Sequence, residues 1–370
     1  MEILKYKINA NEENHYTWIK RGLSLNWGSK RVIVTGGASF IGSHLVDKLV
    51  ELGAEVTVID NFSSGTYENL SKSMDKIRIV EMDLEWCDLT SLIEIMKGHE
   101  IVFHLAAVHG GRGYIHTHPA DVCSNFVIDH HVIEASLEAE VNKVIYASSA
   151  CVYPPKLQQK IDSGYLLKET DSDPFNLDGF LSADVEYGWA KLMGEVQLIA
   201  FYKQYGLKGC SVRFVTAYGP RENETHAITA LIYKAFERMD PYVIWGSGEQ
   251  SRDFTYVADI VDGTILAAEK IDDGTPINLG TGVRYKIKDV AEKIFKIMNW
   301  KPKKLVFDTT KPVGVINRAL DISRAKELLG WEPKVSIEEG LQRTIQWYVS
   351  THKRKGYVDE KILLERTVKK

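Results

Sequence analysis

The chain has no long hydrophobic run and no excess of charge of one sign. In its 370 residues, no window approaches the roughly 20 consecutive apolar residues that a helix needs to cross a bilayer. The formal net charge is −4, so no broad basic field is present to attract nucleic acid or an anionic membrane surface. We therefore expect a soluble protein with no nucleic-acid partner and no membrane partner, in which any phosphate group is bound at a local site.

Cysteine is also scarce. The four cysteines are Cys87, Cys123, Cys151 and Cys210, and they form neither a CxxC pair nor a zinc-ligand spacing. No secretory signal precedes them. We expect reduced thiols, a cytoplasmic location and no bound metal.

The sequence does contain a regular alternation of strand and helix patterns. A β-branched run at Val32–Val34 leads into a glycine-rich turn, an amphipathic helix through Leu52 and a second run from Glu55 to Ile59. Further apolar runs end at Val80, Leu105 and Ala147, with helical patterns such as Leu89–Met96 and Phe126–Ala139 between them. This pattern predicts an α/β fold, a Rossmann doubly wound parallel sheet with helices on both faces.

The alternation weakens after about residue 175, which indicates a smaller α/β C-terminal domain. We predict an N-terminal extension at 1–29, a Rossmann domain at 30–175, a substrate-binding domain at 176–350 and a tail at 351–370. The helix and strand of 186–215 are expected to return to the Rossmann domain, so that the two domains interleave.

The turn from Gly36 to Gly42 lies between the first strand and the first helix. Such a turn lets the backbone approach a pyrophosphate and directs the positive end of the helix dipole toward it. The second strand ends at Asp60, where a carboxylate can accept the ribose hydroxyls and would repel the 2′-phosphate of NADP, so NAD is favoured. The alternative is a nucleotide-free scaffold whose glycines only form turns.

The chain resembles the extended short-chain dehydrogenases/reductases, specifically the sugar-nucleotide epimerases and dehydratases. The resemblance covers roughly Arg31 to Trp347, and it departs from the family at Ser39, where the family has a third glycine. It rests on the glycine turn and on Tyr187–Lys191, Arg252–Val257 and Asn278–Gly282. It implies a nucleotide-sugar substrate, a tightly held NAD and a homodimer formed through two helices of each subunit. The NAD-binding residues are predicted to be Gly36, Ser39, Phe40, Ile41, Gly42, Asp60, Asn61, Asp83, Leu84, Ala106, Tyr187 and Lys191.

Tyr187 and Lys191 are four residues apart, which on a helix places both on one face. The positive charges of Lys191 and of the nicotinamide should lower the pKa of Tyr187, so that it can take a proton from a sugar hydroxyl. The resemblance adds Ser149, whose hydroxyl would contact the same sugar oxygen. The alternative is a surface helix with unrelated serines at a strand end.

Cys151 and His226 are candidates for a second acid–base pair. If the segment stays extended, Cys151 projects to the same side as Ser149, two residues before it. The resemblance is closest to GDP-mannose 3,5-epimerase and GDP-L-fucose synthase, which have a cysteine at this point, and the context of His226 is similar to that of fucose synthase. A histidine titrating near neutral pH suits proton delivery to carbon. Alternatively, Cys151 is a small buried residue and His226 a helix-start or core histidine.

The substrate contacts are implied by the resemblance. Gly110 and Gly111 would line the sugar, and Arg252 and Arg318 would clamp the substrate pyrophosphate with their guanidinium groups. Relatives have asparagine just before their Tyr-Gly or Val-Gly turn, where this chain has Thr216-Ala217-Tyr218-Gly219, which leaves the base and the sugar open. No contacts are assigned to Pro154–Asp184.

The leading hypothesis is an epimerase that oxidises C4 transiently and inverts C3, C5 or both. Plain 4-epimerisation is the first alternative. Epimerisation followed by reduction is disfavoured by Asp60, and dehydration by the lack of a carboxylate at Ala150-Cys151. A catalytically silent nucleotide-sugar sensor is the alternative from a different class.

Overall fold

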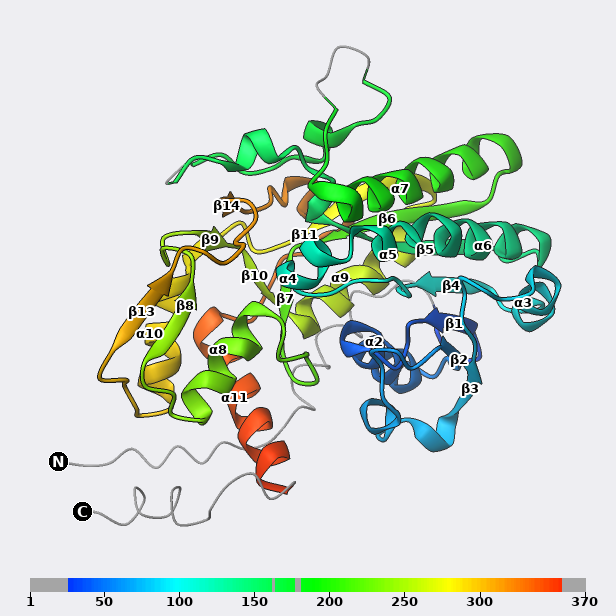
Figure 1. Ribbon diagram of the computed structural model, residues 1–370. Coiled ribbons are helices and arrows are strands. Elements are labelled where there is room, and N and C mark those ends of the chain that lie inside the picture. The colour runs from blue at the N-terminus through cyan, green and yellow to red at the C-terminus, as the bar shows by residue number, and fades with distance from the viewer. Residues whose placement is uncertain (1–25, 162–163, 177–180, 355–370) are drawn as a thin grey trace.

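The computed structural model describes residues 26–161, 164–176 and 181–354. Most of the expected N-terminal extension and residues 355–370 of the expected tail lie outside this range. The described chain forms two lobes, with the larger lobe built on a seven-stranded sheet (Figure 1).

The strands of the large sheet are all parallel, in the order β11-β6-β5-β4-β1-β2-β3. They are β1 (Arg31–Thr35), β2 (Glu55–Asp60), β3 (Ile77–Glu81), β4 (Ile101–His104), β5 (Lys143–Ser149), β6 (Lys208–Phe214) and β11 (Asp273–Leu279). The predicted doubly wound Rossmann sheet is confirmed. β11 also belongs to this sheet, which the sequence analysis did not predict.

Helices cover both faces of the sheet because its strands are apolar on both sides. Val32 and Val34 face a core that includes α2 (Phe40–Glu51) and α9 (Val257–Lys270). Ile33, between them, belongs to the core on the opposite face. The helices of that opposite face are α3 (Leu89–Met96), α6 (Asn125–Glu138) and α7 (Val185–Tyr205).

The smaller lobe has a core of its own, formed around three helices. These are α8 (Ala227–Phe236), α10 (Ile287–Ile297) and α11 (Ile337–Arg354). Its strands pair as β8 (Tyr242–Trp245) with β13 (Leu305–Asp308), as β7 (Thr216–Tyr218) with β10 (Phe254–Tyr256), and as β9 (Ser251–Arg252) between β12 (Tyr285–Lys286) and β14 (Asn317–Arg318). The chain crosses between the lobes several times, so the two are interleaved (Figure 1).

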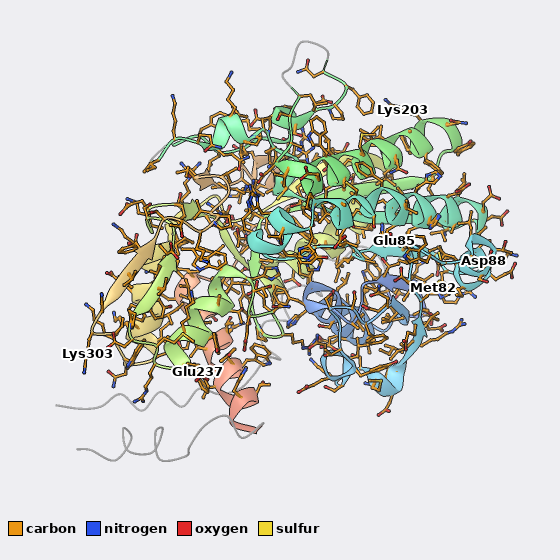
Figure 2. All side chains as sticks on the ribbon, viewed as in Figure 1. Met82, Glu85, Asp88, Lys203, Glu237 and Lys303 are labelled. Atoms are coloured by element: carbon orange, nitrogen blue, oxygen red, sulfur yellow. The ribbon has the colours of Figure 1, made fainter. Side chains whose placement is uncertain are left out.

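Short helical segments connect these elements. They are α4 (Arg112–Thr117), α5 (Pro119–Cys123), the 3₁₀ turns η2 (Tyr67–Leu70), η3 (Met74–Lys76), η4 (Ala150–Val152), η5 (Pro155–Gln158) and η6 (Glu169–Ser172), and the π-helical turn η7 (Ala325–Leu329). Charged side chains such as Asp88, Lys203 and Lys303 project outward at the periphery (Figure 2). Within the described ranges no helix could span a bilayer, and no cluster of His, Cys, Asp or Glu could hold a metal ion.

Candidate active site

The glycine turn after β1 is packed too closely for side chains at two positions. A Cβ on Gly36, whose φ is +68°, would lie 2.7 Å from the backbone nitrogen of Ala106, and a Cβ on Gly42 would lie 2.1 Å from the carbonyl oxygen of Gly36. The departure at Ser39 is accommodated because its hydroxyl donates to the Gly36 carbonyl at 2.6 Å. Ser39 is the N-cap residue of α2, but its side chain makes no capping hydrogen bond to the helix. The first turn of α2, which includes Phe40 and Ile41, contains no acidic residue. Its N–H groups therefore suit an anion.

Asp60 lies beside this turn at the end of β2. One carboxylate oxygen accepts from the backbone N–H of Ala38 and the other from that of Phe62, both at 2.8 Å. Burial raises the pKa of Asp60, and the two backbone bonds oppose that rise. The predicted neighbours are also close, since the Asn61 side chain donates to Asp83 at 3.1 Å. Leu84 is buried next to them. This glycine cradle with a carboxylate beside it fits the adenosine diphosphate part of NAD.

Ser149, Cys151 and Tyr187 lie together where β5 ends and α7 begins. The hydroxyl of Ser149 accepts from the N–H of Cys151 at 3.1 Å. A Cβ on Gly188 would lie 2.2 Å from the carbonyl oxygen of Cys151, so α7 presses directly on this segment. Tyr187 and Lys191 share α7 and are both buried.

The condition that the segment stays extended beyond Ser149 is not met. Residues 150–152 form η4, because the N–H of Cys151 bends back to the Ser149 hydroxyl. Cys151 nevertheless lies at the site, since its Sγ is 3.3 Å from an Nη of Arg318. At that distance the guanidinium can donate a hydrogen bond to the sulfur.

The protonation of Tyr187 differs from the sequence-based expectation. Burial raises the pKa of its phenol well above the ordinary value, and the nearby Cys151 and Asp129 raise it further. Burial also lowers the pKa of Lys191, while the carboxylates of Asp129 and Glu195 oppose that change. In the protein alone, burial and the charges of Cys151 and Asp129 therefore favour the neutral phenol. The positive nicotinamide of bound NAD would supply the opposing charge.

His226 immediately precedes α8 and faces the same region. Its Nδ1 lies 3.4 Å from Glu222, and its ring stacks on His109 with a centroid distance of 6.1 Å. Burial lowers the pKa of His226, but the bond to Glu222 and the charge of that carboxylate outweigh burial and raise it. The predicted Gly-Gly loop approaches from the other side, since a Cβ on Gly111 would lie 2.5 Å from the Thr225 carbonyl oxygen.

Arg252 and Arg318 are brought together by strand pairing. β9 and β14 are parallel neighbours, and in their register Arg252 is the partner of Arg318. Burial and the charges of Arg318 and Arg112 lower the pKa of Arg252 to about 9. Two buried guanidinium groups on neighbouring strands have the charge and the donors that suit an anion.

Three side chains near these arginines were not identified from the sequence. Asp184 accepts from Arg318 at 2.8 Å and from Arg112 through two bonds of 3.0 and 3.1 Å. Gln158 accepts from the Nε of Arg318 at 2.6 Å. Arg112 directly follows the Gly-Gly loop, which was the available signal, whereas Gln158 and Asp184 lie in the segment left without assigned contacts.

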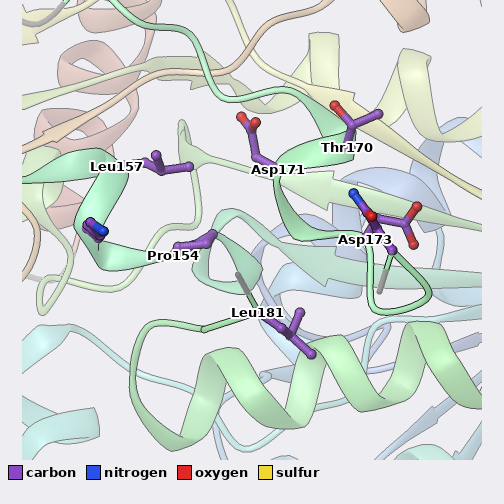
Figure 3. Close-up of a pocket in the computed structure, with 8 residues that line it drawn as sticks. Pro154, Leu157, Thr170, Asp171, Asp173 and Leu181 are labelled. Carbon is purple, nitrogen blue, oxygen red and sulfur yellow. The ribbon is translucent and has the colours of Figure 1, made fainter. Parts of the chain in front are cut away.

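A separate cavity of about 300 Å³ lies between the segments after η4 and around η6 (Figure 3). It is lined by Pro154, Lys156, Leu157, Thr170, Asp171, Asp173, Asn176 and Leu181. None of the predicted catalytic or binding residues lines it, so it is not the site described above.

Comparison with known proteins agrees with this fold. Residues 32–280 match the NAD dependent epimerase/dehydratase family. A UDP-N-acetyl-alpha-D-glucosaminuronate decarboxylase of Bacillus cytotoxicus is 32% identical over 330 residues, which is 86% of this chain and 98% of that protein. GDP-mannose 3,5-epimerase of Arabidopsis thaliana is 29% identical over 94% of this chain and 91% of its own.

Among solved structures, the Thermotoga maritima UDP-glucose 4-epimerase with UDP-glucose is 33% identical, with a TM-score of 0.77 over 87% of this chain and 99% of that chain. The family resemblance inferred from the glycine turn and the Tyr187–Lys191 motif is thereby confirmed. NAD is the cofactor of this family. The chain belongs to the NAD-dependent epimerase/dehydratase family of nucleotide-sugar enzymes.

Proposed function

We propose that this protein is an isomerase, a nucleotide-sugar epimerase that works through a transient 4-keto sugar and inverts C3, C5 or both. The observation that carries the proposal is the placement of Cys151 beside Ser149 and Tyr187, next to Arg318. A second protonatable group, His226, lies near the Gly-Gly loop. A simple 4-epimerase has no use for a second acid–base pair.

The first step needs Ser149, Tyr187 and Lys191. NAD⁺, which the Gly36–Gly42 turn and Asp60 would hold, would supply the acceptor for the hydride of C4. As the hydride leaves, the phenolate of Tyr187 takes the proton of the C4 hydroxyl, and the hydroxyl of Ser149 donates to the same oxygen. Lys191 holds a positive charge next to Tyr187 and favours its ionised form.

The second step uses the acidity of carbons next to a ketone. The carbanion formed at C3 or C5 delocalises onto the C4 oxygen, which Ser149 and Tyr187 hold. The Cys151 thiolate takes the proton from one face, and protonated His226 delivers a proton to the other. The sugar carbon is inverted, and the thiol and the neutral imidazole then exchange their protons with solvent.

The net charge at the three arginines supports a substrate in which the sugar is attached to a nucleoside diphosphate. Arg112, Arg252 and Arg318 carry three positive charges, and Asp184 contributes one negative charge. The net positive charge of two would neutralise the two negative charges of a pyrophosphate diester.

A homodimer is also proposed. α6 and α7 pack against each other and leave apolar side chains partly exposed. Phe126 and Val127 on α6 are 38% and 42% exposed, and Trp189 and Met193 on α7 are both 38% exposed. Burying these side chains against a second copy would form a four-helix interface. Sedimentation at several concentrations would test it, and a monomer at all of them would contradict it.

Plain 4-epimerisation is the second candidate, favoured by the similarity to the UDP-glucose 4-epimerase of Thermotoga maritima. Incubation with GDP-mannose and with UDP-glucose in D₂O, followed by NMR of the sugars, separates the two. The proposal predicts deuterium on a ring carbon next to C4, because exchange requires a carbon acid. A converted sugar with no deuterium on the ring would contradict it and support the 4-epimerase.

A further inference from the structure

Beneath Lys191 lies a buried polar network that is not part of the proposed reaction. Its centre is Asp129 on α6, which is completely buried. One carboxylate oxygen accepts from the hydroxyl of Tyr146 at 2.6 Å, and the other lies 3.0 Å from the Nε2 of His104. A buried carboxylate is costly unless such partners or a cation compensate it.

The hydrogen bonds determine which nitrogen of His104 carries the proton. The hydroxyl of Thr35 accepts from the N–H of Ala106 at 3.2 Å and lies 2.8 Å from the Nδ1 of His104. The ionised carboxylate of Asp129 can only accept, so Nε2 carries the proton and donates to it, and in a neutral ring Nδ1 accepts from the Thr35 hydroxyl. Burial lowers the pKa of His104, in agreement with a neutral ring. His104 is therefore a neutral donor and leaves the negative charge of Asp129 uncompensated.

The cation that can balance the negative charge of Asp129 is Lys191. Its Nζ lies 4.7 Å from the centre of the Tyr146 ring, on the residue whose hydroxyl holds Asp129. A Cβ on Gly194, three residues after Lys191, would lie 2.2 Å from the Tyr146 hydroxyl and 2.8 Å from an oxygen of Asp129. The absence of a side chain at Gly194 thus lets α7 rest directly on the Tyr146–Asp129 pair.

The other carboxylate near Lys191 already has a partner. Glu195 accepts from the Nε of Arg213 at 2.9 Å and from its Nη2 at 2.7 Å, and both side chains are buried. This leaves Asp129 as the carboxylate available to balance Lys191. The titratable and charged groups that face this cluster are His104, His109, Tyr146, Cys151, Tyr187, Glu195 and Arg213.

We propose that Asp129 is a positioning residue, the buried counter-charge that keeps Lys191 protonated and in place next to Tyr187. The inference rests on the proposed role of Tyr187 and Lys191. Asp129 does not touch the substrate. It acts through Lys191, with Tyr146 and His104 fixing its two oxygens.

The test measures the ionisation of Lys191 without any sugar substrate. In NAD-saturated protein, the side-chain ¹⁵N resonance of Lys191 is followed against pH and is assigned by its loss in Lys191→Met. Asp129→Asn removes the buried negative charge that raises the pKa of Lys191. We expect the midpoint for Lys191 to fall by about one pH unit.

Tyr146→Phe is the matched control, because it removes a hydrogen bond from Asp129 but keeps the charge. Its Lys191 midpoint should stay close to that of the unchanged protein. An unchanged or raised Lys191 midpoint in Asp129→Asn, or an equal fall in Tyr146→Phe, would overturn the proposal.

If Asp129→Asn does not fold, Asp129→Ser offers a shorter neutral side chain with the same expected fall. Failure of both neutral variants to fold would assign Asp129 a purely structural role and overturn the proposal. Because no turnover is required, a chain that proves not to be a 3,5-epimerase still gives a decisive titration.

Discussion

The cofactor half and the sugar half of the site are held in place by different means. In the cofactor half the backbone sets the geometry, since Gly36 and Gly42 have no room for a Cβ and Asp60 accepts two backbone N–H groups. In the sugar half, side chains from separate elements hold one another, and Asp184 joins Arg112 of the large lobe to an arginine of the small one. The sugar half should therefore be the easier of the two to disrupt by a single substitution.

The largest effect is expected where the two halves meet, at Tyr187. Tyr187→Phe removes the group that exchanges a proton with the C4 hydroxyl, so turnover should fall by about 10²-fold or more. NAD binding and the unfolding midpoint should change little, because the glycine turn is intact. Tyr205→Phe, at an exposed position of the same helix, is the control. Turnover close to that of the control would remove Tyr187 from the mechanism.

Asp184→Asn tests the ion pairs of the sugar half. It leaves Arg112 and Arg318 without their shared carboxylate, and the free energy of unfolding should fall by about 3 kcal/mol. Added UDP or GDP should recover part of the loss by supplying a new anion. Chemical denaturation measures both effects, with the exposed Asp75→Asn as control. Equal stability of the two variants would show that the pairs contribute nothing.

Asp60→Ala tests the backbone-defined half. Two backbone N–H groups lose their acceptor, so the protein should lose about 1–3 kcal/mol of stability. NAD should bind more weakly and NADP relatively better, because the repelling charge is gone. Calorimetric titration with each cofactor measures this. Unchanged preference for NAD would assign discrimination to other residues.

The smallest effect concerns the pH dependence of His226. Glu222→Gln removes the charge that raises the pKa of His226, so this pKa should fall. If His226 delivers a proton, the alkaline limb of the exchange rate moves to lower pH. A raised histidine pKa adds stability that is complete below about pH 6.5 and is lost as the pH rises through the folded value. The variant should therefore be less stable mainly at low pH. Glu237→Gln, exposed at the end of α8, should leave both profiles unchanged.

Local sequence patterns predicted the elements of the Rossmann sheet closely. The helix expected to run through Leu52 ends at Glu51, and the one expected at Leu89–Met96 has those bounds. These patterns record which face of an element is buried, and that depends on neighbours in the sequence. The position of β11 was missed because an apolar strand does not encode which sheet it joins.

The sequence predicted those parts of the candidate site whose residues lie close together along the chain. The glycine turn, Tyr187 and Lys191 are local, and Cys151 lies two residues from Ser149. The contact between Arg112 and Asp184 spans 72 positions and appears only in three dimensions. The turn η4 was missed because it depends on one side chain accepting from a backbone N–H.

The central claim is that the two halves perform separable chemistry, hydride transfer in one and proton exchange at carbon in the other. The most direct test is Cys151→Ser mixed with GDP-mannose in D₂O, following nicotinamide absorbance and ring deuterium in the same sample. We predict that the transient absorbance of the reduced nicotinamide persists while deuterium incorporation is lost. Retained deuterium incorporation in Cys151→Ser, or loss of both signals together, would contradict the account.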